Sequence, residues 1–121
     1  MSTSARTPDV RSASRVFKAL GDEQRLRIVA LLAHGELCVC HLEAALRLTQ
    51  PTVSRMLSVL KNGGVVDVRR KGSWAYYRLA EQNDALCRSQ LALLARSFGQ
   101  SKTLKADIAR LLKSRGPNAC K

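Results

Sequence analysis

The chain has 121 residues, with 21 Lys and Arg against 9 Asp and Glu, and its formal net charge at pH 7 is +12. This length is typical of one domain that buries a core without disulfides. The positive charge predicts nucleic acid as the partner, because each phosphate that is neutralised releases counterions. A membrane partner is disfavoured, since no apolar run approaches the roughly 18 residues needed to span a bilayer.

Residues 1–10 are polar and lack the apolar segment of a secretory signal, so we expect a disordered N-terminus and a cytoplasmic protein. In that reducing compartment cysteines are expected to be thiols, available for metal or redox chemistry. The chain has four of them: Cys38, Cys40, Cys87 and Cys120. For Cys87, a small buried apolar side chain is an equally good interpretation.

The spacing of apolar residues predicts helices in the first half of the chain. We expect them from about residue 11 to Gly21, from the N-cap Asp22 to Gly35, from about 38 to 48, and from 50 to 62. The second is apolar on more than one side and should be the most buried. Pro51 lies in the first turn of the fourth, where its missing N–H is tolerated.

The second half begins with two predicted strands, residues 65–70 and 73–79, joined at Lys71 and Gly72 as a two-stranded ribbon. A fifth helix is expected over residues 83–98. A sixth is expected over 101–112, before a flexible tail. The apolar stripe of this sixth helix consists of Leu104, Ile108, Leu111 and Leu112. Because one small domain has limited interior, we expect the first and fifth helices to pair in a homodimer.

Two short helices joined by a tight turn and followed by a basic hairpin predict a winged helix–turn–helix domain over residues 11–98, with 99–121 as a C-terminal extension. The fold is expected to be mainly α with a small β-hairpin wing. The fourth helix should lie in the major groove of DNA, where Arg reads guanine and Gln reads adenine. The side chains expected to contact bases or phosphates are Gln50, Thr52, Ser54, Arg55, Arg69, Arg70 and Lys71.

Four ordered segments, residues 19–28 (ALGDEQRLRI), 36–40 (ELCVC), 50–55 (QPTVSR) and 72–79 (GSWAYYRL), resemble the ArsR/SmtB family of metal-responsive repressors. The resemblance spans about residues 12–98. It implies a homodimer formed through the first and last main helices, which binds a palindromic double-stranded operator and leaves it when an effector binds.

Within that family, the ELCVC segment resembles arsenite and antimonite sensors and also cadmium/lead sensors. The resemblance implies that Cys38 and Cys40 bind arsenic(III) or antimony(III), inorganic or as methylarsenite. The arsenite pattern often has a third cysteine where this chain has Glu43, and the cadmium/lead pattern adds N-terminal cysteines that are absent. Cys120, Cys87 or a non-sulfur ligand is expected to complete the shell, and His41 is expected to lie on the surface.

Residues two apart on a regular helix point about 200° away from each other, because each residue turns by about 100°. Cys38 and Cys40 can therefore bind one ion only if the first turn of the third helix unwinds or is already irregular. That helix supports the predicted DNA-reading helix, so the two sites are coupled. Alternatives on the same fold are a thiol-redox or persulfide switch and a Cd/Pb-responsive repressor. An enzyme is disfavoured, since the chain offers no phosphate-binding Gly-rich loop and no paired carboxylates.

Overall fold

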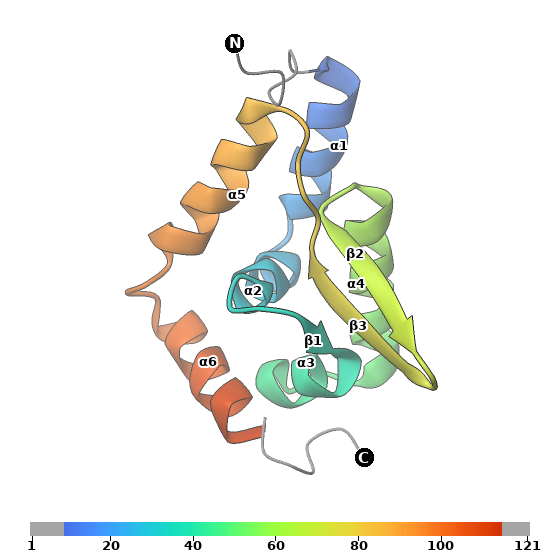
Figure 1. Ribbon diagram of the computed structural model, residues 1–121. Helices are drawn as coiled ribbons and strands as arrows, with labels where there is room; N and C mark the ends of the chain where they lie inside the picture. Colours follow the sequence, from blue (N-terminus) through green and yellow to red (C-terminus); the bar gives the residue numbers. More distant parts are fainter. Residues whose placement is uncertain (1–8, 115–121) are drawn as a thin grey trace.

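The computed structural model describes residues 9–114, drawn in colour in Figure 1. The expected flexible tail after residue 114, with Cys120, and most of the expected disordered N-terminus lie outside these residues. Among the helices between residues 9 and 114, none is long and apolar enough to cross a membrane.

The first half of the chain forms helices at the expected places: α1 Val10–Leu20, α2 Glu23–Leu32, α3 Val39–Leu46 and α4 Gln50–Asn62. Asp9 and Asp22 accept hydrogen bonds from the backbone N–H groups three residues on, of Ser12 and Arg25, and so cap α1 and α2. The prediction of α2 as a core helix is confirmed. Its buried side chains are Ile28, Val29, Leu31 and Leu32.

The sheet has three strands and not the expected two. Its strands are β1 Leu37–Cys38, β2 Val66–Lys71 and β3 Trp74–Leu79, in the antiparallel order β1-β3-β2. Gly72 has a φ of 60° at the turn between β2 and β3, a conformation that suits a residue without Cβ. The added strand β1 pairs Leu37 with Tyr77 and Cys38 with Tyr76. The cysteine segment is therefore attached directly to the wing.

The second half ends in two helices, α5 Ala85–Ser97 and α6 Lys102–Ser114. In Figure 1, α6 lies beside α2 and α3 at the opposite end of the molecule from α1. Leu104 and Leu111 are buried as expected, but Leu112 is 66% exposed and Asp107 takes a buried position on the inner face. The expected stripe was wrong at this point, because a carboxylate that is fully paired can occupy a core position.

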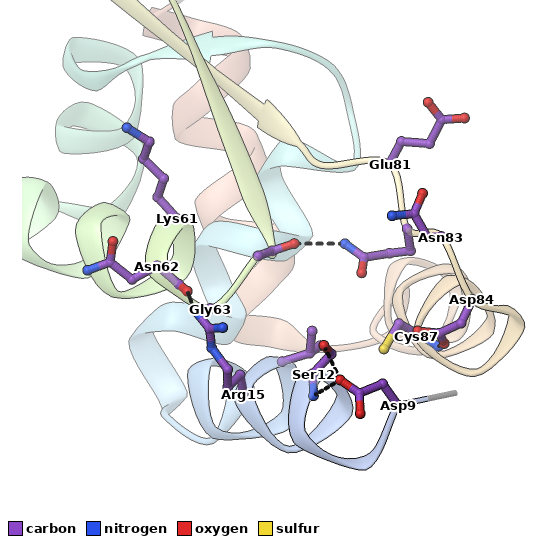
Figure 2. Close-up of a pocket in the computed structure, with 13 residues that line it drawn as sticks. Asp9, Ser12, Arg15, Lys61, Asn62, Gly63, Glu81, Asn83, Asp84 and Cys87 are labelled. Atoms are coloured by element: carbon purple, nitrogen blue, oxygen red, sulfur yellow. Dashed lines mark hydrogen bonds between the residues drawn. The ribbon is translucent and has the colours of Figure 1, made fainter. Parts of the chain in front are cut away.

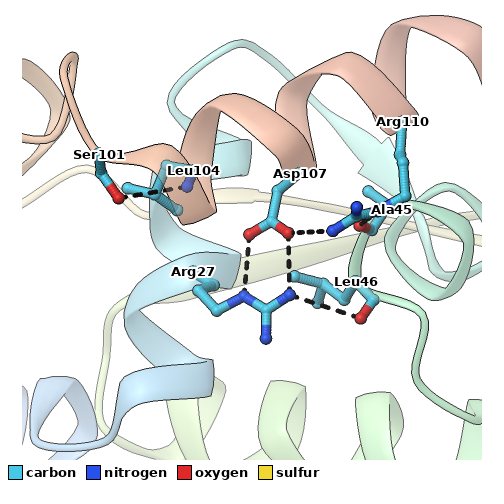
Figure 3. Close-up of polar contacts among 7 residues, drawn as sticks. All are labelled: Arg27, Ala45, Leu46, Ser101, Leu104, Asp107 and Arg110. Atoms are coloured by element: carbon cyan, nitrogen blue, oxygen red, sulfur yellow. Dashed lines mark hydrogen bonds and ion pairs between the residues drawn. The ribbon is translucent and has the colours of Figure 1, made fainter.

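Asp107 is the centre of a buried ionic cluster that joins α6 to the rest of the domain (Figure 3). Its carboxylate accepts two hydrogen bonds of 2.8 Å from Arg27 of α2 and one of 2.6 Å from Arg110 of α6. Arg110 also donates to the carbonyl of Ala45 at 2.7 Å, and Arg27 approaches the carbonyl of Leu46 at 3.5 Å. Both carbonyls belong to the last turn of α3. The cluster therefore holds the end of α3 just before the turn into α4.

Helices α1 and α5 lie side by side at one end of the molecule and leave apolar side chains uncovered (Figure 1). Large exposed apolar residues on these two helices are Val10, Phe17, Leu86 and Leu93. Val10 is 84% exposed, and the other three are between 37% and 45% exposed. A single chain thus buries only part of the apolar surface of this helix pair.

Candidate functional site

Helices α3 and α4 are joined by a tight turn that places α4 on the outside of the domain. Arg47, which follows α3, adopts the left-handed conformation with a φ of 56° and ends the helix. Thr49 is extended and precedes α4, although its side chain does not bond the helix backbone. The direction of the turn is therefore set by the backbone angles of Arg47 and Thr49 and not by a side-chain cap. The first residues of α4 remain accessible.

Helix α4 has one buried face and one accessible face, as the spacing of its apolar residues predicts. Val53, Leu57 and Leu60 are fully buried. Four residues expected to read DNA lie together in its first half: Gln50, Thr52, Ser54 and Arg55. Of these, Gln50 and Arg55 are exposed and the other two are half-buried. The Gln50 side chain donates a 2.7 Å hydrogen bond to the Ser54 hydroxyl, so these two side chains hold each other in place.

The basic residues of the wing are not equivalent. Arg70 and Lys71 are exposed at the end of β2. Arg69 instead binds Glu36, with hydrogen bonds of 2.6 and 3.1 Å, and its guanidinium lies 5.0 Å from the centre of the Tyr76 ring. These hydrogen bonds lower the pKa of Glu36. Arg69 therefore links the wing to the residue that precedes β1, a role that the sequence alone did not indicate.

Cys38 and Cys40 meet at the junction of β1 and α3. Cys38 is the last residue of β1 and the N-cap of α3, with extended backbone angles of −89° and 166°, and Cys40 lies in the first turn of the helix. The two sulfur atoms are 2.7 Å apart. The helix predicted from about residue 38 begins at Val39. Because Cys38 is not helical, both sulfurs face the same point without any unwinding of α3.

His41 joins this pair, contrary to the expectation that it lies on the surface. It is half-buried, and its Nδ1 lies 3.3 Å from the Cys38 sulfur and 3.4 Å from the Cys38 backbone nitrogen, which donates to it. The candidate ligand atoms of Cys38, Cys40 and His41 all lie within 4.8 Å of one another. The three-residue interval between Cys38 and His41 was a usable signal, because N-cap and N3 side chains meet at the start of a helix.

Cys87 lies elsewhere, in the first turn of α5, where its backbone N–H donates a 2.8 Å hydrogen bond to Asp84. Figure 2 shows it among the residues that line a pocket between α1, the end of α4 and the segment before α5. The volume of this pocket is about 540 Å³. The thiol is 1% exposed, and burial together with Asp84 raises its pKa. Cys87 does not belong to the group formed by Cys38, Cys40 and His41. In this chain it fits the interpretation of a small buried apolar side chain.

The helical core, the α3–turn–α4 unit and the basic β2–β3 hairpin define a winged helix–turn–helix protein. Residues 22–68 match the family model described as bacterial regulatory protein, arsR family. The solution structure of the homodimeric winged helix–turn–helix domain Mb0332 from Mycobacterium bovis superimposes with a TM-score of 0.62 at 39% identity, covering 70% of this chain and 76% of that one. The chain belongs to the ArsR family.

Two curated relatives are similar to the central part of the chain. The arsenic resistance transcriptional regulator ArsR1 of Pseudomonas putida is 54% identical over 65 residues, which cover 53% of this chain and 51% of the relative. The arsenical resistance operon repressor of Escherichia coli is 49% identical over 67 residues, covering 54% of this chain and 57% of the relative. The chain thus spans about half the length of the curated relatives it matches.

Proposed function

We propose that the protein is a DNA-binding transcriptional repressor that releases its operator when arsenic(III) or antimony(III) binds the thiols of Cys38 and Cys40. The observation that carries this proposal is the convergence of the two sulfurs, 2.7 Å apart, at the start of the helix that supports α4. Soft thiolate donors prefer soft ions, and the N-terminus of a helix favours the thiolate form. The similarity to an arsenic resistance regulator of Pseudomonas putida and to an arsenical resistance operon repressor of Escherichia coli supports arsenic as the effector.

The DNA-binding half of the proposal rests on α4 and the wing. Gln50, Thr52, Ser54 and Arg55 would face the major groove, and Arg70 and Lys71 would contact the neighbouring backbone. Arg69 would also contact a phosphate if one of its hydrogen bonds to Glu36 were exchanged for a hydrogen bond to DNA. The uncovered apolar side chains of α1 and α5 support a homodimer, as in Mb0332, and a two-fold symmetric dimer calls for a palindromic operator.

Two paths connect the thiols to the DNA-binding elements. Cys40 lies in α3, which leads through Arg47 into α4. Cys38 pairs with Tyr76 of the wing, and the preceding Glu36 holds Arg69. An ion that draws the two sulfurs into its own geometry therefore acts on both the reading helix and the wing. Coupling of binding energies is reciprocal, so DNA should weaken the binding of the effector by the same factor.

Titration with arsenite tests the proposal directly. We expect an absorbance band from thiolate-to-arsenic charge transfer that saturates at the same arsenite concentration as release from DNA. Thiol oxidation is the second candidate function, because the same closeness of the sulfurs allows a disulfide or persulfide to form. Release by an oxidant or persulfide donor alone, with no arsenic band, would decide for that alternative.

Arg55 and Lys71 are expected to contribute to DNA binding in different ways. Arg55→Ala should reduce operator selectivity, because a base contact is lost, with a loss of about 1–3 kcal/mol on the operator that random DNA does not show. Lys71→Ala should weaken binding to all duplexes alike and reduce the salt slope by about one unit. Fluorescence anisotropy with operator and random DNA over a range of salt measures both. Equal losses on random DNA for the two variants would refute the assignment.

Glu36→Gln is expected to tighten binding to every duplex and to steepen the salt slope by about one unit, because it releases Arg69 for a phosphate contact. Glu81→Gln is the matched control. It removes the same charge from an exposed residue between β3 and α5. If both variants raise the affinity equally, the effect comes from net charge and not from Arg69.

A further inference from the structure

We propose that His41 is the third protein donor of the thiol site, which makes it a Cys2His site able to hold a thiophilic divalent cation such as Zn²⁺ or Cd²⁺. The inference rests on the proposed function in one respect, that Cys38 and Cys40 bind an ion. It adds a donor that an arsenical bound by two sulfurs does not require, and it adds a second class of ligand. From the sequence, a surface position of His41 was favoured over a role as a ligand.

The distances between the donors fit such an ion. A tetrahedral ion with Zn–S bonds of about 2.3 Å and Zn–N bonds of about 2.0 Å separates two sulfurs by about 3.8 Å and a sulfur from a nitrogen by about 3.5 Å. The Cys38 sulfur and the His41 Nδ1 are already 3.3 Å apart. The two sulfurs are 2.7 Å apart and would have to separate by about 1 Å, which side-chain rotation can provide.

The position of the three residues also fits a binding site. Cys38 is buried and its backbone is fixed by pairing with Tyr76 in β3, whereas Cys40 and His41 are half-buried. One side of the site is thus held by the sheet and the other is open. An open side admits the ion and leaves a position for water as a fourth ligand. Among residues 9–114, these three form the group of Cys, His and acidic side chains close enough to hold an ion together.

The same nitrogen of His41 also caps α3, and this gives cation binding a distinct consequence. Nδ1 accepts the N–H of Cys38 at 3.4 Å, which places the imidazole proton on Nε2. The single lone pair on Nδ1 cannot accept this hydrogen bond and bind a cation at once. A divalent cation therefore breaks the hydrogen bond by which His41 contributes to the capping box of α3, whereas an arsenical bound by two sulfurs leaves this bond in place. The two ligand classes would act differently on the helix that supports α4.

Cobalt(II) is the direct probe, because its visible absorption reports the number and geometry of its ligands. We would compare the wild type with His41→Ala and with His34→Ala, a matched control at the chain's other histidine, which is exposed after α2. His41→Gln adds a second control, since Gln at this position keeps a cap acceptor for α3. Cd²⁺ affinity and binding of phenylarsine oxide, whose arsenic needs only two sulfurs, complete the set.

We expect His41→Ala and His41→Gln to lose at least about tenfold in affinity for Co²⁺ and Cd²⁺. Changing a residue that only hydrogen-bonds to a metal ligand already costs about tenfold or more, and loss of a ligand itself should cost at least as much. Both should change the Co²⁺ spectrum and bind phenylarsine oxide within about twofold of the wild type. Unchanged Co²⁺ affinity and spectrum in His41→Ala would overturn the inference, as would a wild type that binds the arsenical but no divalent cation. Failure of the wild type to bind the arsenical, with Co²⁺ bound through His41, would instead reject arsenic as the effector.

Discussion

A chain carrying both Cys38→Ser and Cys40→Ser is expected to bind operator DNA within about twofold of the wild type and to remain bound at any arsenite concentration. The residues proposed to contact DNA lie on α4 and the wing, and neither cysteine is among them. Serine has nearly the same shape, but its hydroxyl is a poor donor for a soft ion. The wild type should show a loss of operator affinity of about 5–150-fold, the usual size of coupling between sites. Mobility shift at increasing arsenite measures both.

Cys87→Ser is the matched control for the double variant. This thiol is buried in α5 and does not belong to the Cys38, Cys40 and His41 group, so its loss should leave the arsenite response intact. If the double variant still leaves DNA on addition of arsenite, the pair is not the effector site. If Cys87→Ser loses the response while the double variant keeps it, the effector binds at α5.

Asp107→Ala is expected to lower the free energy of unfolding by about 2–4 kcal/mol. The carboxylate is fully buried and satisfies Arg27 and Arg110, whose side chains are 16% and 27% exposed. Removing one partner of a buried ionic cluster leaves the remaining charges unpaired, and this costs about 3–5 kcal/mol when those charges are fully buried. The cost is smaller here because water reaches the two arginines. Urea unfolding followed by circular dichroism measures the change.

The same variant should also weaken operator binding, because Arg27 and Arg110 bond the carbonyls of the last turn of α3. Asp67→Ala is the control, since this aspartate is exposed on β2. A loss of stability below about 0.5 kcal/mol for Asp107→Ala, equal to that of the control, would show that α6 is not anchored through this carboxylate.

Most of the fold could be predicted from the sequence because its signals are local. The capping residue Asp22, the 3.6-residue apolar period, and Gly63 and Gly64 after α4 predict the helix positions to within a few residues. Strand β1 could not be predicted, because Leu37 and Cys38 are only two residues and show no alternating pattern. Their pairing with Tyr77 and Tyr76 is a tertiary contact. The buried place of Asp107 was missed for the same reason, since its arginine partner on α2 is 80 residues away in the chain.

The candidate site was predicted in part. Cys38 and Cys40 stand out by their spacing, but helical geometry alone sets them on opposite sides of a helix. The extended backbone of Cys38 removes this conflict, and that backbone follows from the unpredicted strand β1. His41 was missed because its three-residue spacing from Cys38 is informative only once Cys38 is recognised as the N-cap of α3. Arg69 was predicted as a wing cation, but its bonds to Glu36 depend on the position of β1 beside the wing.

We expect that an ion bound at Cys38 and Cys40 weakens the binding of DNA at α4 and the wing, and that bound DNA weakens the binding of the ion. The most direct test is to measure operator affinity with and without saturating arsenite, and arsenite affinity with and without saturating operator, on the same wild-type protein. Both affinities should fall by the same factor. Thiols saturated with arsenic, shown by the charge-transfer band, together with an unchanged operator affinity would contradict it.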